Sequence, residues 1–314
     1  MEMRRSTIVL IFVFLTLTLM FGCSKGKMGS NSAGMMKIFR DQLDRRVKVK
    51  FPPRRIVSMA PSVTEMLFAI GLGDKIVGVT DYCDYPPAAL KKPKIGGYYN
   101  PNVETILSLN PDLVIATADG YNRGVVNKLT SLGISCYVVN PQTIEGILNT
   151  MIELGRITGR TKEAQETVER LRRRVEAIRS KVREIPPDRR VKVFYCVGPT
   201  ELWTAGSGTY IDDLIEEAGG INIAHGSKQH WFQFSGEELI KDNPDVIIVA
   251  GMISNDKAAD LPLWSKYKEV KAVREGKIYP FDPDMLNRPG PRSVDVLEMM
   301  FKRFYPSGGS ADDK

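Results

Sequence analysis

The sequence contains few of the side chains that build metal centres. It has four cysteines and two histidines among 314 residues. Cys83, Cys136 and Cys196 are widely separated, and their spacing matches no zinc site, iron–sulfur cluster or disulfide framework. One disulfide among them could form in an oxidising compartment, but the pattern favours buried free thiols. The sequence therefore predicts no resident metal site.

Motifs of the common enzyme classes are also missing. The chain has no GxxxxGK[ST] phosphate loop, no GxSxG nucleophile elbow and no HExxH motif. A net charge of +7 and a pI of about 9.1 would allow nucleic-acid binding. However, the basic cluster at residues 170–174 alternates with glutamates, as is typical of a solvated helix face. The sequence predicts no enzyme, no cofactor of its own and no nucleic-acid partner.

The first 22 residues indicate export. Arg4 and Arg5 precede an apolar run at residues 8–21, which is shorter than the roughly 20 residues that span a membrane. This order predicts a signal peptide over residues 1–22. The run ends at LMFGC, which resembles a bacterial lipobox, so acylation of Cys23 is expected. The mature protein should then lie in the periplasm or on the outer face of the cell membrane, anchored through a segment at residues 23–53.

That segment begins with a polar stretch at residues 24–34, which is expected to be a flexible tether. From residue 54 onward, short β-branched runs alternate with helical patterns. Strands are expected at residues 55–59, 76–80, 113–116 and 135–139, and helices at 62–70, 103–109 and 125–132. The alternation predicts a doubly wound α/β lobe over residues 54–157.

One long helix is expected after this lobe. Residues 161–184 contain no glycine or proline, and apolar side chains recur there at three- and four-residue spacings. A second α/β series follows, with strands at residues 191–197, 246–249 and 277–281 and helices at 210–218, 237–241, 264–273 and 293–304. The simplest architecture has two α/β lobes, the second at residues 188–306, bridged by one rigid helix at residues 158–187 and followed by a tail at 307–314.

The tripeptide Asn-Pro-Asp occurs once in each lobe. It begins at Asn110 and at Asn243, which are 243 − 110 = 133 positions apart, after a predicted helix and before an apolar strand. A glutamate lies six residues before each copy, at Glu104 and Glu237, in the first turn of the helix. A single such turn is common. The matched register favours one supersecondary unit that is used in both lobes.

Five stretches of the sequence together resemble a known family. They are RIVSMAPSVTEMLFAIGLGDKIVGVT, DYCDYPPAA, KIGGYYNPNVETILSLNPDLVIA, GSGTYIDDLIEEAGGINIA and RPGPR. In this order they resemble the Fe/B12 periplasmic-binding family, the substrate-binding lipoproteins of ABC importers for vitamin B12, haem and ferric siderophores. The vitamin B12-binding members are the nearest likeness. The resemblance implies a class III periplasmic binding protein fold and a monomer that captures a metal-bearing corrinoid, haem or ferric chelate between its lobes.

The resemblance also gives the repeated glutamates a role. In vitamin B12-binding members, one exposed glutamate per lobe docks onto arginines of the membrane permease, and the local motifs place these positions at Glu104 and Glu237. An acid in the first turn would stabilise its helix as well. Glu65 is expected instead to close a capping box with Ser62. Glu238, three residues after a serine, is interpreted in the same way.

For the ligand, the resemblance implies a site of aromatic faces and directed polar groups. The matching positions are Tyr82, Tyr98, Trp203, Trp231, Asp284 and Arg288. Aromatic faces suit a broad, largely apolar macrocycle, and the site is expected to bind a corrinoid. Any one aromatic could equally pack in a core, as is expected of Trp264. Thr117 stands where the vitamin B12 binder has another tryptophan, which departs from the corrinoid pattern.

Haem and ferric siderophores stay open as alternatives. Haem-binding members use a tyrosine near the GGYY block as an iron ligand, so Tyr98 or Tyr99 could bind haem, with His230 as a second ligand. Anionic siderophores would need two or more arginines in the cleft. Arg288 and Arg292 could supply them, although Arg292 is expected to cap the last helix. An enzyme or metal-cluster protein on the same scaffold is disfavoured, because the cysteines lack the spacing for a cluster.

Overall fold

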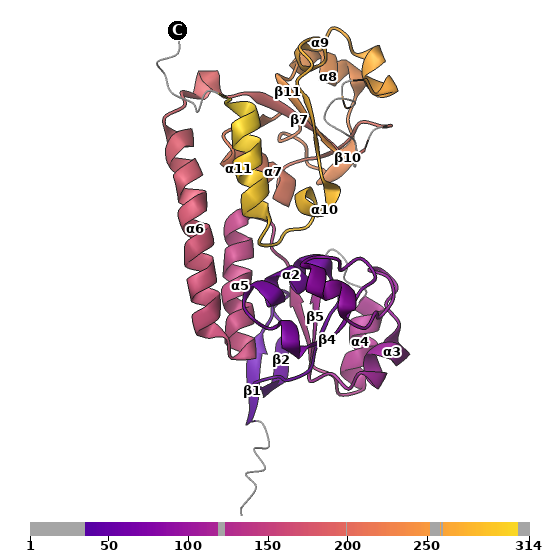
Figure 1. Ribbon diagram of the computed structural model, residues 1–314. Helices are drawn as coiled ribbons and strands as arrows, with labels where there is room; N and C mark the ends of the chain where they lie inside the picture. Colours follow the sequence, from indigo (N-terminus) through magenta and orange to yellow (C-terminus); the bar gives the residue numbers. More distant parts are fainter. Residues whose placement is uncertain (1–34, 119–122, 199, 252–257, 259, 307–314) are drawn as a thin grey trace, which may run out of the picture. The chain divides into compact units, whose positions relative to one another are not determined.

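The computed structural model describes residues 35–118, 123–198, 200–251, 258 and 260–306 (Figure 1). The expected signal peptide, Cys23, the tether and the tail lie outside the described residues. Residues 35–314 cluster as one unit. Over the described ranges, none of the helices has the length and apolar character needed to cross a membrane. Cys83, Cys136 and Cys196 are buried and free, as the sequence predicts.

The N-terminal lobe is built on a parallel four-stranded sheet. Its order is β4 (Ile76–Val79), β3 (Ile56–Ser58), β5 (Leu113–Thr117) and β6 (Cys136–Val139). Its helices are α2 (Pro61–Ala69), α3 (Val103–Ser108) and α4 (Arg123–Ser131). Because side chains alternate along a strand, Leu113 and Ile115 pack in the core that contains α2, while Val114 and Ala116 pack with α3 and α4. Helices on both faces confirm the doubly wound lobe.

The C-terminal lobe repeats this plan. Its parallel sheet has the order β12 (Ile278–Phe281), β11 (Val246–Ala250), β7 (Lys192–Cys196) and β9 (Ile221–Asn222). The helices around it are α7 (Tyr210–Glu217), α8 (Gly236–Asp242), α10 (Pro283–Leu286) and α11 (Ser293–Phe304). The helix expected at residues 264–273 is wrong: a 3-10 turn, η5 (Pro262–Lys266), and a short helix, α9 (Lys271–Arg274), stand in its place. The expected burial of Trp264 is confirmed.

Two antiparallel two-stranded sheets, the first of them a hairpin, were not expected from the sequence. One pairs β1 (Met35–Arg40) with β2 (Arg46–Phe51), and the other pairs β8 (Trp203–Ala205) with β10 (Trp231–Gln233). The first lies in the segment interpreted as tether and N-terminal extension, where frequent lysine and arginine obscure the strand pattern. The second is built from two three-residue strands, which are too short to show a periodicity.

The lobes are joined by a pair of helices. The long helix is α6 (Thr161–Arg183), as expected, and it follows α5 (Ile144–Thr158), with which it packs (Figure 1). The first half of α6 contacts the N-terminal lobe, where the Thr167 hydroxyl donates to the Ala69 carbonyl at 3.3 Å. The second half contacts the C-terminal lobe, where Arg174 pairs with Asp295 at 2.6 Å and Arg179 with Glu217 at 2.6 Å.

The two Asn-Pro-Asp segments have the same structure. Asn110 and Asn243 both adopt left-handed φ angles, 45° and 48°, after α3 and α8. The following aspartates bind the start of the neighbouring strand: Asp112 accepts from the Arg55 backbone N–H at 3.0 Å, and Asp245 accepts from Lys192 N–H at 2.8 Å. The geometry supports the interpretation of the repeat as one unit used in both lobes.

Candidate functional site

A cavity of about 740 Å³ lies between the two lobes. The N-terminal lobe contributes Pro61, Ser62, Tyr82, Tyr98, Tyr99, Thr117, Pro141 and Gln142. The C-terminal lobe contributes Tyr195, Val197, Thr209, Tyr210, Ile211, Trp231, Pro283, Asp284, Asn287, Arg288 and Pro289. This volume is in the upper part of the range typical of small-molecule sites. Five of the six expected ligand residues therefore line one cavity.

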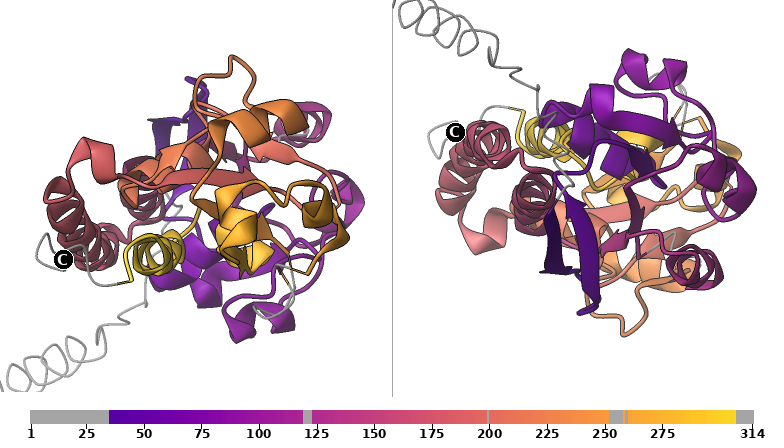
Figure 2. Two further views of the ribbon diagram at one scale, coloured as in Figure 1. Left: turned by 90° about the horizontal axis from the view of Figure 1, so that it is seen from above. Right: turned by 90° about the horizontal axis from the view of Figure 1, so that it is seen from below.

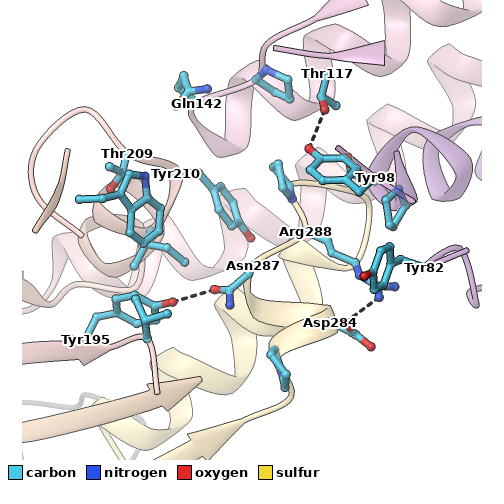
Figure 3. A pocket seen from close by; sticks show the side chains of 18 of the residues that line it. Tyr82, Tyr98, Thr117, Gln142, Tyr195, Thr209, Tyr210, Asp284, Asn287 and Arg288 are labelled. Carbon is cyan, nitrogen blue, oxygen red and sulfur yellow. Dashed lines mark hydrogen bonds and ion pairs between the residues drawn. The ribbon is translucent and has the colours of Figure 1, made fainter. Parts of the chain in front are cut away.

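The aromatic part of the N-terminal wall consists of three tyrosines in the segment between β4 and α3. Tyr82 lies three residues beyond β4, and its side chain is 60% exposed. Tyr98 is hydrogen-bonded through its hydroxyl to Thr117 Oγ1 at 2.8 Å, at the end of β5 (Figure 3). The Tyr99 ring stands edge-on to Tyr98, with centroids 4.8 Å apart, and is 71% exposed. The hydroxyl of Thr117 thus fixes one phenol while its two neighbours stay accessible to a ligand.

The opposite wall combines one tryptophan with two buried phenols. Trp231 lies on β10, with its ring 6.3 Å from that of Tyr195, which donates its hydroxyl to Asn287 Oδ1 at 2.8 Å (Figure 3). Tyr210 donates to Ser293 Oγ at 2.7 Å. Burial raises the pKa of both Tyr195 and Tyr210, so these two phenols remain neutral. These three side chains offer aromatic surface without charge.

Charge enters the cavity at one edge, through Arg288. Its guanidinium contacts Asp84 of the N-terminal lobe and Asp284 of its own lobe, each at 2.6 Å. Burial alone would raise the pKa of Asp84, but the hydrogen bond and charge of Arg288 outweigh it and lower that pKa. At Asp284 burial dominates, and the pKa is raised despite Arg288. The cluster therefore links the lobes, and two of its members, Arg288 and Asp284, line the cavity.

A second arginine also joins the lobes, and here the sequence interpretation is wrong. Arg292 occupies the N-cap position of α11, but its side chain makes no capping hydrogen bond, and Glu65 does not cap α2, whose N-cap is Ala60. Instead the two side chains form a bidentate pair, with Nε–Oε2 at 2.9 Å and Nη2–Oε1 at 2.6 Å. The Glu65 side chain is only 2% exposed. The sequence pattern was misleading because a capping box is local, whereas these partners are 227 residues apart. By contrast, Ser235 does cap α8.

Two expected contributors lie outside the cavity lining. Trp203, on β8, is 43% exposed and donates its indole N–H to Glu201 at 3.1 Å. His230 bonds through Nδ1 to the Ser207 carbonyl at 2.9 Å and is not a lining residue either. His230 directly precedes Trp231, so alternation along the strand directs its side chain to the other side. Trp203 pairs with Gln233, so it lies on the same face as Trp231 but two residues farther along the pair of strands, outside the cavity lining. Arg292 is likewise absent from the lining, because it is bound to Glu65.

Several lining residues were missed by sequence reasoning. They include Tyr195, Tyr210, Asn287 and Gln142. Asp84, the partner of Arg288, was also missed, although it is not itself a lining residue. Asn287 and Asp84 lie close in sequence to the expected Arg288 and Tyr82, and that proximity was an available signal. Tyr195 sits inside a strand, where a core role is the ordinary expectation.

The glutamates of the repeat are both exposed. Glu104, in the first turn of α3, lies 3.3 Å from Lys128. The pKa of Glu104 is lowered, first by its own backbone N–H and then by Lys128. Glu237 occupies the first turn of α8, and no basic residue in the described part of the chain pairs with it. A separate group, Asp212, Glu216 and His225, holds its ligand atoms within 4.8 Å of one another on the C-terminal lobe, apart from the cavity lining.

Comparisons with known proteins agree with this architecture. Residues 56–285 match the periplasmic binding protein family. The chain is 32% identical over 270 residues to an ABC transporter substrate-binding lipoprotein of Bacillus subtilis, covering 85% of this chain and 84% of that one. It is 31% identical over 251 residues to a vitamin B12-binding protein of Vibrio cholerae, covering 80% and 88%.

Solved structures give the same result. The crystal structure of a periplasmic vitamin B12 binding protein of Vibrio cholerae superposes with a TM-score of 0.72 at 29% identity, over 82% of this chain and 99% of that one. A periplasmic haem-binding protein of Vibrio cholerae superposes with a TM-score of 0.71 at 26% identity, over 80% and 99%. The chain therefore belongs to the periplasmic binding protein family, as a non-enzymatic substrate-binding protein of an ABC importer that takes a small ligand and acts with a permease.

Proposed function

We propose that the protein captures a corrinoid of the vitamin B12 type between its lobes and delivers it to its permease. The observation that carries this proposal is the interlobe cavity, with exposed tyrosines on one wall and Trp231 on the other. Opposed aromatic faces suit a flat, largely apolar macrocycle. The relatives named as vitamin B12-binding at 28–32% identity support the same ligand.

The polar edge of the cavity also fits a corrinoid. Its amide side chains can both donate and accept hydrogen bonds, and the cluster of Arg288, Asp84 and Asp284 offers donors and acceptors within one small region. Thr117 does not replace the missing tryptophan as an aromatic face, but it orients Tyr98 through the 2.8 Å hydrogen bond. Tyr98 and Tyr99 supply the aromatic surface on that wall.

Haem is the second candidate, because the Tyr98 and Tyr99 phenols adjoin each other at the cavity and either could bind iron. His230 gives no support, since it does not line the cavity. An anionic ferric siderophore fits less well. Of the two arginines expected for it, only Arg288 lines the cavity. Two acids, Asp84 and Asp284, already neutralise Arg288.

Tryptophan fluorescence can separate these ligands. Purified protein is titrated with cyanocobalamin, haemin and a ferric catecholate. We expect saturable quenching by cyanocobalamin at the lowest concentration, and Trp231→Phe should remove most of it. Trp203→Phe is the matched control, because Trp203 is outside the cavity lining, and it should leave the binding curve unchanged. If haemin binds more tightly than cyanocobalamin, and its Soret band shifts on binding to the parent but not to Tyr98→Phe, then haem and not a corrinoid is the ligand.

Docking to the permease is proposed to use Glu104 and Glu237. Both are exposed, both occupy equivalent positions in the repeated unit, and they lie on different lobes. An acid on each lobe could pair with arginines on a two-fold-related permease and hold the cavity over the entrance. Charge pairs of this kind mainly set orientation and association rate.

Reversal of these charges tests the docking proposal. Glu104→Arg and Glu237→Arg should each weaken capture by the detergent-solubilised permease at least tenfold, and the effect should shrink at high salt. Glu238→Arg is the control, since Glu238 is the exposed neighbour of Glu237 on the same helix. Equal capture of all three variants would refute the docking role and leave the ligand proposal untouched.

Anchorage is proposed to occur through acylation of Cys23, which would place the protein on the outer face of the cell membrane or on a periplasmic membrane face. The lipobox-like LMFGC sequence supports it, as does the relative from Bacillus subtilis that is named a lipoprotein. Metabolic labelling with a fatty acid should mark the intact protein and not Cys23→Ser. Labelling of the variant at the same level would contradict the anchor.

A further inference from the structure

The β1–β2 hairpin has two unlike faces. Its inner face packs on the N-terminal lobe: Val47 and Val49 are 7% and 0% exposed, and Phe39 packs against the same core. Residues that pair across the hairpin share a face. The register therefore defines an outer face made of three cross-strand pairs, Met36 with Lys50, Ile38 with Lys48, and Arg40 with Arg46.

This outer face is exposed, cationic and partly apolar. The Met36 and Ile38 side chains are 57% and 51% exposed, and the four basic residues of the outer face are all exposed. The acid next to them, Asp44 in the turn, pairs with Arg40 at 2.6 Å, and Asp41 is buried against Arg45. Three cations of the outer face, Arg46, Lys48 and Lys50, have no acidic partner within the described residues. Two exposed apolar side chains amid cations are typical of a surface that adsorbs to anionic lipid.

Chain length places this hairpin close to a membrane. Met35 begins β1 only 35 − 23 = 12 positions after Cys23. A fully extended chain spans about 3.5 Å per residue, so an acylated Cys23 would confine the hairpin to within about 40 Å of the lipid surface. Lys25 and Lys27 in that short segment carry the same sign of charge. Such a tether gives the hairpin a high effective concentration at the lipid surface, so a weak electrostatic attraction is enough to hold it there.

We infer that the outer face of the β1–β2 hairpin is a membrane-contact surface that binds anionic phospholipid. The inference draws its proximity argument from the proposed anchor at Cys23, but the surface itself is defined by the hairpin alone. β2 contacts α5, whereas α3, which carries Glu104, lies across the same lobe in Figure 1 and in the right-hand view of Figure 2. Docking through Glu104 would leave the hairpin uncovered.

Vesicle binding by unacylated protein tests this surface. The chain from residue 23 with Cys23→Ser is mixed with vesicles of about one-third phosphatidylglycerol in phosphatidylcholine, in about 0.05 M salt, and sedimented. Loss of two surface cations should lower the partition coefficient about thirtyfold, so Lys48→Gln/Lys50→Gln should bind far more weakly. Lys266→Gln/Lys268→Gln is the matched control, with the same charge change at two exposed lysines of the C-terminal lobe, and it should bind like the parent.

A second readout does not depend on the charge variants. A polarity-sensitive dye on Ile38→Cys should shift its emission to the blue with anionic vesicles and not with pure phosphatidylcholine, and the three buried native thiols should leave it selectively labelled. Equal binding by the two lysine variants, or no dye shift, would overturn the inference. If the protein binds no vesicles but sediments as a dimer that forms through the open edge of β1, the outer face would instead be a contact with a second copy of the chain. If the intact protein takes up no fatty-acid label at Cys23, the proposed anchor is refuted, but the vesicle result still tests the hairpin surface by itself.

Discussion

The two lobes share their framework and differ at the cavity. Each contains a four-stranded parallel sheet and the same Asn-Pro-Asp unit, with asparagine in a left-handed conformation and an aspartate bound to the next strand. At the cavity, the N-terminal lobe supplies exposed tyrosines from loops, while the other supplies Trp231, from the antiparallel pair of β8 and β10, and Arg288. The repeated parts thus fix the scaffold and the placement of surface acids, and the parts that differ shape the ligand site.

The two interlobe arginines differ in the same way: one supports the scaffold and the other lies at the cavity. Both belong to the C-terminal lobe and both reach an acid of the other. Arg292 meets Glu65 in the interior, where the carboxylate is 2% exposed, whereas Arg288 meets Asp84 at the cavity, where the carboxylate is 45% exposed. A buried pair is costly to break and a solvated pair is not. We therefore assign Arg292 to stability and Arg288 to the ligand.

The largest expected effect comes from Arg292→Met. It leaves the Glu65 carboxylate buried without its partner, and we expect the free energy of unfolding to fall by about 3 kcal/mol near pH 8 in urea titrations. Burial already raises the pKa of Glu65 against the opposing effect of Arg292. Without the arginine, Glu65 should protonate more readily, so the loss should be smaller near pH 5.

Arg288→Met is the matched control for this comparison. Its partners Asp84 and Asp284 are partly solvated, so we expect a loss of at most about 1 kcal/mol in stability together with a clear loss of ligand affinity. If the two variants lose equal stability, the assignment of one arginine to structure and the other to the ligand fails.

A second prediction concerns the helices that join the lobes. A Cβ on Gly155 in α5 would lie 2.4 Å from the Cβ of Ala164 in α6 and 2.8 Å from the Arg160 carbonyl oxygen. Gly155→Ala should therefore destabilise the protein by about 1–3 kcal/mol through overpacking, although alanine is the better helix former by about 1 kcal/mol. Gly226→Ala, where nothing lies within 4 Å, should change the urea midpoint little. A gain in stability for Gly155→Ala would show that the helices separate easily.

The third prediction is a pH dependence at the junction of α5 with α7. Asp213 accepts the Ile144 backbone N–H at 2.7 Å, and burial raises the pKa of Asp213 to about 6. A carboxyl whose pKa is higher in the folded state favours folding when protonated, so its contribution is present at pH 4 and lost as pH rises through 6. We expect the stability of the parent relative to Asp213→Asn to fall by about 1–2 kcal/mol over that window. A constant difference between pH 4 and 8 would contradict this assignment.

The smallest expected effect is structural. Because α6 is fastened to both lobes, ligand binding should change the relative position of the lobes little. Small-angle scattering of free and ligand-saturated protein should give radii of gyration that agree within about 1 Å, in contrast to the large closure of hinged two-lobed proteins. A change of several ångströms would mean that α5 and α6 bend.

Much of the framework could be predicted from the sequence, because it rests on local patterns. The strands of the N-terminal sheet, three of the four in the C-terminal sheet and α6 follow from apolar periodicity, and the repeat follows from Asn110 and Asn243. The two-residue strand β9 is too short to be predicted. Five of the six expected ligand residues line the cavity, since loops after parallel strands meet at one edge of a sheet. Composition alone could not show which aromatic residues line the ligand site. The resemblance of the chain to its family identified them.

What could not be predicted depends on partners far apart in the sequence. Glu65 fits a capping box locally, and only the folded chain brings Arg292 to it. Trp203 was misplaced because the pairing of β8 with β10 sets it two residues along from Trp231, and two three-residue strands leave no sequence signal for that pairing. The β1–β2 hairpin was missed because its outer residues are mostly charged and its inner apolar face is narrow.

The fastening of α6 to both lobes has a consequence for release. A binding protein that barely closes on its ligand stores little strain, and the ligand cannot leave by a simple relaxation of the free protein. Spreading the cavity requires the lobes to separate against the Arg292–Glu65 pair and against the Arg174 and Arg179 pairs along α6. The work for that separation must come from outside, and a permease docked as proposed on Glu104 and Glu237 would hold one point on each lobe and be placed to supply it.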